Sequence, residues 1–343
     1  MAALTTQVQL AARPIGDPKP TDFRIVEVEL PDIQDGEFLA RVIYQSLDPY
    51  MRGRMDDAKS YAAPVPLGCV MEGGTVAEII ESKHPKFRKG DIVNSRFGWQ
   101  THAISNGTGV RTVDPLIAPI STSLGVLGMP GMTAYVGLLE IGEPKTGETV
   151  VVSAASGAVG AVVGQIAKHK GCRVIGIAGV KEKCDYVVGE LGFDGCVSHH
   201  SDTLNEDLAA ECPDGIDVYF ENVGGKVFEA VLPLVNPFAR IPICGLISRY
   251  SHTGDFPGPN ELPGLMRAVL TNKLKIHGFI ISDRWDRFPD FEKDMSNWIR
   301  TGTIKYREDF VDGLKNAPQA FMGLLKGKNF GKLIVRISED PTK

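Results

Sequence analysis

The pattern of apolar and polar residues changes character near residue 121. Before this point, segments such as 23–30 and 38–44 alternate side chains of the two kinds, and the turn dipeptide Asp35-Gly36 separates them. An alternation with a period of two residues predicts β-strands. Further segments punctuated by Gly and Pro, including 73–80, continue to residue 97. Many short strands of this kind predict a small barrel or sandwich.

From residue 150 onward, apolar runs alternate with segments of helical spacing. The runs predict strands at 150–152, 173–178, 195–197, 215–221 and 238–244, and the segments between them predict helices at 158–170, 182–190, 204–211 and 226–234. This alternation is typical of a doubly wound parallel sheet. Residues 274–281 are a candidate sixth strand, 290–300 a helix, and the Pro- and Gly-rich residues 249–263 a loop.

The last part of the chain is β-like again, because residues 331–337 read Gly-Lys-Leu-Ile-Val-Arg-Ile. A β-strand after the α/β block predicts that the chain returns to its first domain. We therefore expect residues 1–125 and 304–343 to form one domain, with an α/β dinucleotide-binding domain, 126–303, inserted into it. A chain of 343 residues is long enough for both.

The strand, turn and helix at 150–164 form the strongest candidate for a ligand site. The N-terminus of a helix presents backbone N–H groups and the positive end of its dipole, and small residues let a pyrophosphate approach closely. The usual dinucleotide fingerprint is G-x-G-x-x-G, and here Ala155 occupies the first glycine position while Gly157 and Gly160 are kept. The alternative is a tightly packed helix without a ligand. The complete strand–helix–strand context favours the cofactor.

Composition and charge exclude several classes of function. The chain is 43% hydrophobic and 23% charged, as globular proteins are, and its formal net charge of -5 argues against general nucleic-acid binding. No apolar run approaches the roughly 18 residues that span a membrane. Residues 1–10 lack the basic and apolar regions of a secretory signal. We therefore expect a cytoplasmic protein without nucleic-acid or membrane partners.

The six cysteines contain no C-x-x-C pair. This spacing predicts neither a zinc ribbon nor a redox dithiol, and in a reducing compartment the cysteines are expected to be small buried hydrophobic residues. A catalytic metal needs converging His, Cys or carboxylate ligands. Cys69 and Glu72 have no histidine beside them, and adjacent His199 and His200 would point to opposite faces of a strand. We therefore expect no metal site.

The end of the second strand of the α/β block bears on the choice of cofactor. NAD sites usually carry an acid about 20 residues beyond the glycines, where it binds the ribose 2′-hydroxyl. Residues 177–180 contain no acid, and Lys181 and Lys183 open the next helix. Lysines at this place favour the 2′-phosphate of NADPH through charge-assisted hydrogen bonds. Lys181 is better explained as solvated surface charge, and Lys183 is the candidate phosphate ligand.

Six motifs occur in a fixed order along nearly the full length. They lie at residues 47–54 (LDPYMRGR), 128–135 (GMPGMTAY), 154–160 (AASGAVG), 220–225 (FENVGG), 243–248 (ICGLIS) and 327–333 (GKNFGKL). In this order they resemble zinc-independent medium-chain dehydrogenases/reductases, and among these the prostaglandin reductase, plant alkenal double-bond reductase and bacterial curcumin reductase group. Zinc-dependent relatives carry Gly-His-Glu where residues 67–73 keep the Glu and lack the His.

The resemblance implies a fold and an activity. The fold would be a GroES-like β-barrel built from the two chain ends, with a Rossmann domain inserted between them. NADPH would bind in the cleft, and a homodimer would form through the Rossmann sheets. The implied reaction is reduction of the carbon–carbon double bond of α,β-unsaturated ketones or aldehydes.

The resemblance also assigns roles to residues of this chain. The implied cofactor-binding residues are Ser156, Gly157, Ala158, Val159, Gly160, Lys183, His199, Asn222, Cys244, Gly245 and Asn329. Tyr250 stands at the position of an active-site tyrosine, and the implied substrate contacts are Tyr50, Arg52, Met132 and Tyr250, with the two tyrosines as catalytic candidates. His199 replaces a phosphate-contacting tyrosine, and it is either a hydrogen-bond donor to the 2′-phosphate or a surface residue at a strand end. Tyr50 either lines the cleft or is a packed barrel aromatic.

The implied reaction needs a hydrogen-bond donor at the substrate carbonyl. Negative charge develops on this oxygen when hydride reaches the β-carbon, and a donor aimed at it stabilises the enolate. Tyr250 or the cofactor's ribose 2′-hydroxyl could donate this bond, and water could supply the proton to the α-carbon. Two alternatives are an NADPH:quinone reductase and a non-enzymatic NADPH-binding protein.

Overall fold

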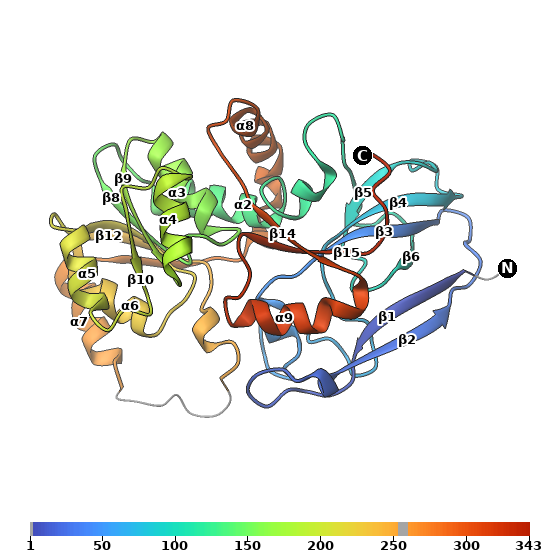
Figure 1. Ribbon diagram of the computed structural model, residues 1–343, viewed down its shortest axis with the longest axis horizontal. Coiled ribbons are helices and arrows are strands. Elements are labelled where there is room, and N and C mark those ends of the chain that lie inside the picture. Colours follow the sequence, from blue (N-terminus) through green and yellow to red (C-terminus); the bar gives the residue numbers. More distant parts are fainter. Residues whose placement is uncertain (1–2, 253–259) are drawn as a thin grey trace. The chain divides into compact units, whose positions relative to one another are not determined.

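Two units account for the described part of the chain (Figure 1). A computed structural model describes residues 3–252 and 260–343, so that part of the loop predicted at 249–263 lies outside the described residues. One unit contains Met1–Gly125 and Glu308–Lys343, and the other contains Val126–Arg307. The chain thus returns to its first unit slightly later than the predicted residue 304. The physical reason is that the backbone N–H and C=O of Lys305 hydrogen-bond the side-chain amide of Gln165, at 2.8 and 2.9 Å.

The first unit is built from β-strands of both chain ends. A two-stranded antiparallel sheet pairs β1 (Leu4–Leu10) with β2 (Phe23–Glu29). A seven-stranded sheet has the order β14-β15-β3-β4-β5-β7, with β6 also paired to β3. Its strands are β3 (Phe38–Ser46), β4 (Thr75–Ser82), β5 (Ile92–Ser95), β6 (His102–Ser105), β7 (Arg111–Thr112), β14 (Glu308–Asp312) and β15 (Lys332–Arg336). The C-terminal strand β15 lies antiparallel to β3, as the returning β-tail requires.

Aromatic side chains join the pieces of the first unit. The fully buried Trp99 stacks on Phe23 of β2 with ring centroids 5.9 Å apart, and Phe321 packs edge-on against Trp99 at 5.6 Å. Phe321 belongs to α9 (Ala317–Leu325), a helix that the sequence analysis did not predict. The short helix α1 (Met51–Arg54) contributes Met51 to the same core. This core therefore ties the C-terminal segment to the N-terminal strands.

The second unit contains a parallel sheet of six strands in the order β10-β9-β8-β11-β12-β13. The strands are β8 (Thr149–Ser153), β9 (Arg173–Ala178), β10 (Gly195–Ser198), β11 (Ile216–Phe220), β12 (Val235–Ile243) and β13 (Lys275–Gly278). The predicted strands all occur, the candidate sixth included. The direction of winding reverses between β8 and β11, and in such sheets ligands bind outside the carboxyl ends of the strands at this switch point.

Helices cover the two faces of this sheet, as a doubly wound fold requires. They are α3 (Gly160–His169), α4 (Lys181–Gly189), α5 (Leu204–Glu211), α6 (Lys226–Val231) and α7 (Leu262–Asn272). Two further helices of this unit, α2 (Met129–Val136) and α8 (Phe288–Arg300), contact each other, and α2 also contacts α3. The side chains of Ile175 and Ile177 pack with α5 and α6 in one apolar cluster. Gly176 between them faces Ala155 and Val187 of α4, because successive strand residues point to opposite faces. No helix among residues 3–252 and 260–343 is both long and apolar enough to cross a membrane.

Helix α7 shows where the sequence pattern misled. It begins at Leu262, inside the segment predicted as a loop, and Pro263 occupies its first turn. Proline is tolerated there because the first N–H groups of a helix have no partner within the helix. Proline was interpreted as a loop signal, although at this position it is compatible with a helix start.

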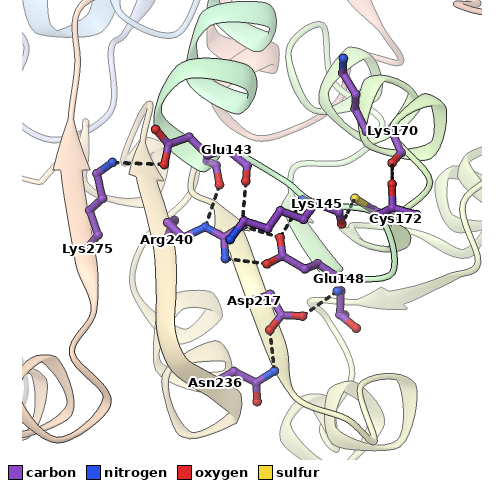
Figure 2. A network of polar contacts seen from close by, with 12 residues as sticks. Glu143, Lys145, Glu148, Lys170, Cys172, Asp217, Asn236, Arg240 and Lys275 are labelled. Carbon is purple, nitrogen blue, oxygen red and sulfur yellow. Dashed lines mark hydrogen bonds and ion pairs between the residues drawn. The ribbon is translucent and has the colours of Figure 1, made fainter.

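A polar network fixes the segment before β8 against the neighbouring strands (Figure 2). Arg240 of β12 pairs with Glu148 and donates to the backbone oxygen of Gly142 at 2.9 Å. Asp217 of β11 accepts from the backbone N–H of Thr149 at 2.9 Å and from the amide of Asn236 at 2.8 Å. Most of these contacts lie at the starts of the strands. They set the alignment of β8, β11 and β12, which in turn fixes where the carboxyl ends of these strands fall.

Candidate functional site

The turn after β8 is shaped by the absence of side chains. Ala154 adopts a positive φ of 51°, and the N–H of Gly157 donates to its carbonyl oxygen at 2.9 Å. A Cβ on Gly160 would collide with this carbonyl oxygen and would lie 2.9 Å from its carbon. Helix α3 can therefore begin directly against the turn. The N–H groups of Ala161 and Val163 at its start donate to the carbonyl oxygens of Gly157 and Val159, both at 3.0 Å. The positive end of the helix dipole points at the turn and favours an anion there.

The structure explains why alanine is tolerated at the first fingerprint position. Ala155 is buried, and its methyl group faces Gly176 on the neighbouring strand β9. A Cβ on Gly176 would lie only 2.8 Å from that methyl group. Alanine fits at this position because the positive φ of the turn belongs to Ala154 and not to Ala155, and because a glycine in β9 leaves room for the Ala155 methyl group.

The ends of β8 and β11 are joined at the switch point of the sheet. The backbone N–H of Asn222 donates to the hydroxyl of Ser153, and its side-chain amide donates to the carbonyl of Ser153, both at 2.8 Å. The Ser153 hydroxyl in turn donates to the carboxylate of Glu221 at 3.0 Å. These bonds hold Asn222, a predicted cofactor residue, in one orientation at the carboxyl edge of the sheet.

Glu221 is a buried acid that sequence reasoning did not single out. Its carboxylate accepts from the N–H of Val223 at 2.6 Å, and its backbone oxygen accepts from the N–H groups of Cys244 and Gly245 at 2.9 and 3.1 Å. Burial raises the pKa of Glu221 above its usual value, and the hydrogen bond from Val223 opposes the shift. Glu221 therefore orders two predicted cofactor segments at once. Its signal in the sequence is a charged residue directly after an apolar strand.

Positive charge gathers at the ends of β9 and β10. Lys183 lies in the first turn of α4, and His199 follows β10. Burial lowers the pKa of His199 to about 4, and the charges of His200, Lys226 and Lys183 add to the effect. Lys226, the first residue of α6, is thus a member of this cluster that sequence reasoning missed. A neutral His199 within the field of Lys183 and Lys226 is an environment that favours an added anion, since an anion relieves the repulsion.

Lys181 and Lys183 differ in their exposure, and the role of Lys183 at a phosphate stays a prediction. The side chain of Lys181 is 85% exposed and forms an ion pair with Asp185 at 2.6 Å on the same helix. Lys183 is half-buried and close enough to His199 to lower its pKa.

Tyr250 is held close to the turn that follows β12. Its hydroxyl accepts a hydrogen bond from the N–H of Leu246 at 3.2 Å. A Cβ on Gly245 would lie 2.9 Å from the same oxygen, so glycine is needed for this approach. Tyr250 and the predicted cofactor residues Cys244 and Gly245 therefore form one local arrangement. Burial raises the pKa of the Cys244 thiol to about 12, which keeps it protonated at neutral pH.

In the first unit, a buried ion pair supports the turn that carries Tyr50. The ammonium group of Lys332 contacts the carboxylate of Asp48 at 2.7 Å and the backbone oxygen of Leu47 at 2.8 Å. Burial and the charge of Asp48 raise the pKa of Tyr50 far above its usual value, so the phenol stays protonated. Two motifs from opposite ends of the chain are thus joined beneath this tyrosine.

Three predicted site residues have structural contacts. Arg52 is fully buried, pairs with Asp56 at 2.5 Å and donates to the backbone oxygen of Gly16 at 2.9 Å. Met132 is fully buried in α2, and the amide of Asn329 donates to the carbonyl of Gly331 at 2.8 Å. The expected contacts of these three residues with substrate or cofactor stay predictions.

The segment where zinc-dependent relatives would hold their metal contains an ion pair instead. Glu72 lies 3.8 Å from the buried guanidinium of Arg54, which also stacks over the ring of Tyr61 at 4.5 Å. Burial raises the pKa of Glu72, and the charge of Arg54 opposes the shift. Among residues 3–252 and 260–343, no three His, Cys, Asp or Glu side chains gather in a way that could hold a metal ion.

Comparison with known proteins gives matches along nearly the whole chain. Residues 6–113 match the family described as the N-terminal domain of oxidoreductase, and residues 158–299 match the zinc-binding dehydrogenase family. The NADPH-dependent curcumin reductase of Escherichia coli (strain K12) is 54% identical over 96% of both chains. Prostaglandin reductase 1 of Oryctolagus cuniculus is 43% identical over 92% of this chain and 89% of its own. A crystal structure of CurA from Vibrio vulnificus in complex with NADPH is 52% identical, covers 98% of this chain and 100% of its own, and has a TM-score of 0.94.

Proposed function

The chain belongs to the medium-chain dehydrogenases/reductases, in the group of the curcumin and prostaglandin reductases, and from this we propose that it reduces the carbon–carbon double bond of α,β-unsaturated ketones and aldehydes with NADPH. The observation that carries the proposal is the nearly full-length match, at 54% identity, to a protein named NADPH-dependent curcumin reductase. The arrangement at the carboxyl ends of β8 to β12 supports it.

The residues present fit NADPH better than NADH. The turn 156–160 and the start of α3 offer backbone N–H groups and no Cβ at Gly160, so they suit a pyrophosphate. Residues 177–180 at the end of β9 contain no acid, where NADH would need one for its ribose hydroxyl. Lys183, Lys226 and His199 instead place positive charge at this edge, which suits a 2′-phosphate. Asn222, Cys244 and Gly245 would lie along the nicotinamide ribose, and Asn329 of the first unit is proposed as a further contact.

The chain's own residues would orient the substrate and stabilise the enolate. Bound NADPH supplies the hydride that the β-carbon accepts. Tyr250 is proposed to donate its hydroxyl proton as a hydrogen bond to the carbonyl oxygen, where negative charge develops. The Leu246 N–H donates to the Tyr250 oxygen. This bond strengthens Tyr250 as a donor, because a hydroxyl group that accepts one hydrogen bond becomes a better donor of another. Water would protonate the α-carbon, so the reaction requires no titrating His or Cys.

Tyr50 is proposed as a second contact for the substrate oxygen. Its raised pKa means that it remains a hydrogen-bond donor throughout the physiological pH range. Arg52 and Met132 are retained as proposed substrate contacts of lower priority, because both side chains are fully buried. We rank Tyr250 above Tyr50 as the catalytic donor because Tyr250 lies beside the proposed nicotinamide segment 244–245.

The protein is further proposed to be a cytoplasmic homodimer. Strand β13 lies at the end of the six-stranded sheet, and an edge strand offers backbone groups to a further strand. Next to it, α7 exposes Leu262, Met266 and Leu270, which are four residues apart and therefore share one face of the helix. An exposed apolar face of this kind is typical of a protein–protein contact. A second copy of the chain would supply both an apolar face and an edge strand.

A substrate panel tests the proposed activity. Purified protein is mixed with NADPH and open-chain enones, 2-alkenals or quinones, and oxidation of NADPH is followed by its absorbance. We expect turnover with enones and enals, and much slower turnover when NADH replaces NADPH. Faster reduction of quinones than of enones would contradict the proposal. Tight NADPH binding without turnover of any member of the panel would identify a binding protein instead.

A further inference from the structure

Two turns at the carboxyl edge of the parallel sheet are hydrogen-bonded to each other along their length. The first turn, 221–225, follows β11, and the second, 244–250, follows β12. Three successive backbone oxygens of the first turn accept N–H groups of the second. The bonds run from Cys244 and Gly245 to Glu221 at 2.9 and 3.1 Å, from Ile247 to Asn222 at 3.1 Å, and from Ser248 to Val223 at 3.0 Å. The second turn is therefore held in place by the first.

The second turn carries Tyr250, the proposed donor to the substrate carbonyl. The tyrosine oxygen accepts from the N–H of Leu246 at 3.2 Å, and the tyrosine N–H donates to the backbone oxygen of Ile247 at 3.3 Å. A Cβ on Gly245 would lie 2.9 Å from the tyrosine oxygen and 3.5 Å from the backbone oxygen of Asn222. The hydroxyl group of Tyr250 and the backbone of the first turn thus both approach the same glycine closely. A shift of the first turn would change the surroundings of this hydroxyl group.

The side chain of Glu221 fixes the first turn to the neighbouring strand β8. Glu221 is fully buried, and one of its carboxylate oxygens accepts from the N–H of Val223 at 2.6 Å and from the hydroxyl of Ser153 at 3.0 Å. This hydroxyl also lies 3.2 Å from the backbone oxygen of Phe220 and accepts from the N–H of Asn222 at 2.8 Å. Because β8 and β11 are the central pair of the six strands, the turn is anchored to the interior of the sheet.

The position of the accepting oxygen matters more here than its charge. Burial raises the pKa of Glu221, and the hydrogen bonds from the N–H groups of Val223 and Gly224 only partly oppose the shift. The charged form is thus costly in this place. An amide side chain of the same length could accept the same two bonds through its oxygen. We therefore expect glutamine, and not alanine, to replace Glu221 without loss of the anchor.

We propose that Glu221 is a positioning residue for the reduction, because its side chain, through the two bonded turns, places the hydroxyl group of Tyr250 at the substrate oxygen. This inference rests on the proposed function, in which Tyr250 is the donor. Glu221 is fully buried, so it acts only through the residues around it. A misplaced donor stabilises the enolate less, and a misplacement of about 1 Å can lower a rate by up to ~100-fold. The loss is expected in kcat, since the proposed phosphate contacts of the cofactor stay unchanged.

Kinetics of enone reduction and NADPH titrations test the proposal on two variants. Glu221→Ala should lower kcat about 3- to 10-fold and change the NADPH dissociation constant by less than about 3-fold. Glu221→Gln should retain most of the wild-type kcat. The control Asp194→Ala removes a carboxylate that also accepts a backbone N–H, that of Val174 at 2.7 Å, at the start of β9. It should lower the free energy of unfolding and leave kcat unchanged. A wild-type kcat in Glu221→Ala, or equal losses in the alanine and glutamine variants, would overturn the proposal.

A double-mutant cycle with Tyr250→Phe tests whether Glu221 acts through this tyrosine. In the Tyr250→Phe background, Glu221→Ala should lower kcat further by less than about 2-fold, because the hydroxyl group that Glu221 positions is already absent. The same loss of kcat in both backgrounds would show that Glu221 does not act through Tyr250 and would overturn the proposal. Ser153→Ala removes the other end of the anchor and is measured in parallel, in case Glu221→Ala does not fold. Its effect on kcat should depend on Tyr250 in the same way.

Hydrogen exchange of the unliganded protein gives a readout that does not depend on turnover. Glu221→Ala should speed the exchange of the N–H groups of residues 244–248, whereas Glu221→Gln and Asp194→Ala should not. Unchanged exchange of these groups in Glu221→Ala would overturn the link between the two turns. A wild type that reduces no enone would instead contradict the proposed function, and the exchange rates would still report whether Glu221 orders the second turn.

Discussion

Replacing Lys183 by alanine tests its proposed contact with the 2′-phosphate separately from the other proposed cofactor contacts. The substitution removes one positive charge from the cluster at the ends of β9 and β10 and leaves the phosphate turn untouched. A hydrogen bond to a charged group contributes about 1.5–3 kcal/mol, which corresponds to roughly 10- to 150-fold in affinity. Lys183 is half-buried, so solvent screening places the expected effect in the lower part of this range, at about 10- to 30-fold.

The neighbours of Lys183 make this effect depend on pH. Lys183 is one of the groups that lower the pKa of His199, after burial, His200 and Lys226. Its removal lets that pKa rise, and a bound phosphate raises it further. At about pH 6 the imidazole of the variant can then take up a proton and replace part of the lost charge, whereas at about pH 8 it stays neutral. The loss of NADPH affinity should therefore be larger at the higher pH.

The assay is a pair of titrations with NADPH and NADH on three proteins. Lys181→Ala is the matched control, because it removes the same charge two residues earlier from a side chain that is 85% exposed and paired with Asp185. We expect Lys183→Ala to weaken NADPH binding alone and Lys181→Ala to change neither nucleotide. Equal loss for NADPH and NADH, or the same loss in both variants, would refute the assignment of Lys183 to the 2′-phosphate.

Four further outcomes follow from the same structure. Gly160→Ala forces a methyl group against the Ala154 backbone and should weaken NADPH and NADH binding alike by about 1–3 kcal/mol, measured by titration. An effect on NADPH alone would contradict the proposal that this turn binds the pyrophosphate, which both nucleotides contain. Tyr250→Phe should lower kcat for enone reduction at least about tenfold with little change in the NADPH dissociation constant; an unchanged kcat would exclude it as the donor. Met266→Glu should shift the protein to a monomer in light scattering, whereas Leu116→Glu should not. If both variants remain dimers, the exposed face of α7 is not the dimer contact. Because the folded pKa of His199, about 4, lies below its unfolded value, the unliganded protein should lose stability as the pH falls from about 6.5 toward 4. Chemical denaturation should show a flatter pH dependence for His199→Asn, and an unchanged slope would contradict the burial of a neutral imidazole.

Much of the fold is local in origin and could therefore be predicted from the sequence. The buried strands of the second unit are continuous apolar runs between helices, so strands such as β9 and helices such as α5 occur at the predicted residues. The prediction was weaker where one signal fits two structures. Pro263 is compatible with a loop and with the first turn of α7, and only its packing context distinguishes them.

The candidate site shows the same division. Gly157, Gly160 and Lys183 could be proposed from the sequence, because a phosphate site needs small residues and a cation at fixed distances along one strand–helix unit. Glu221 and Lys226 were missed, because their importance comes from contacts with other strands and helices.

The sequence by itself determined the order of strands and helices along the chain, the glycine-containing turn after β8 and the lack of an acid at residues 177–180, because each depends on residues close together in the chain. Only the tertiary structure decided which distant side chains became neighbours. It placed Gly176 opposite Ala155, which explains the missing fingerprint glycine. Such contacts follow from strand register and helix packing, which the local pattern of residues leaves open.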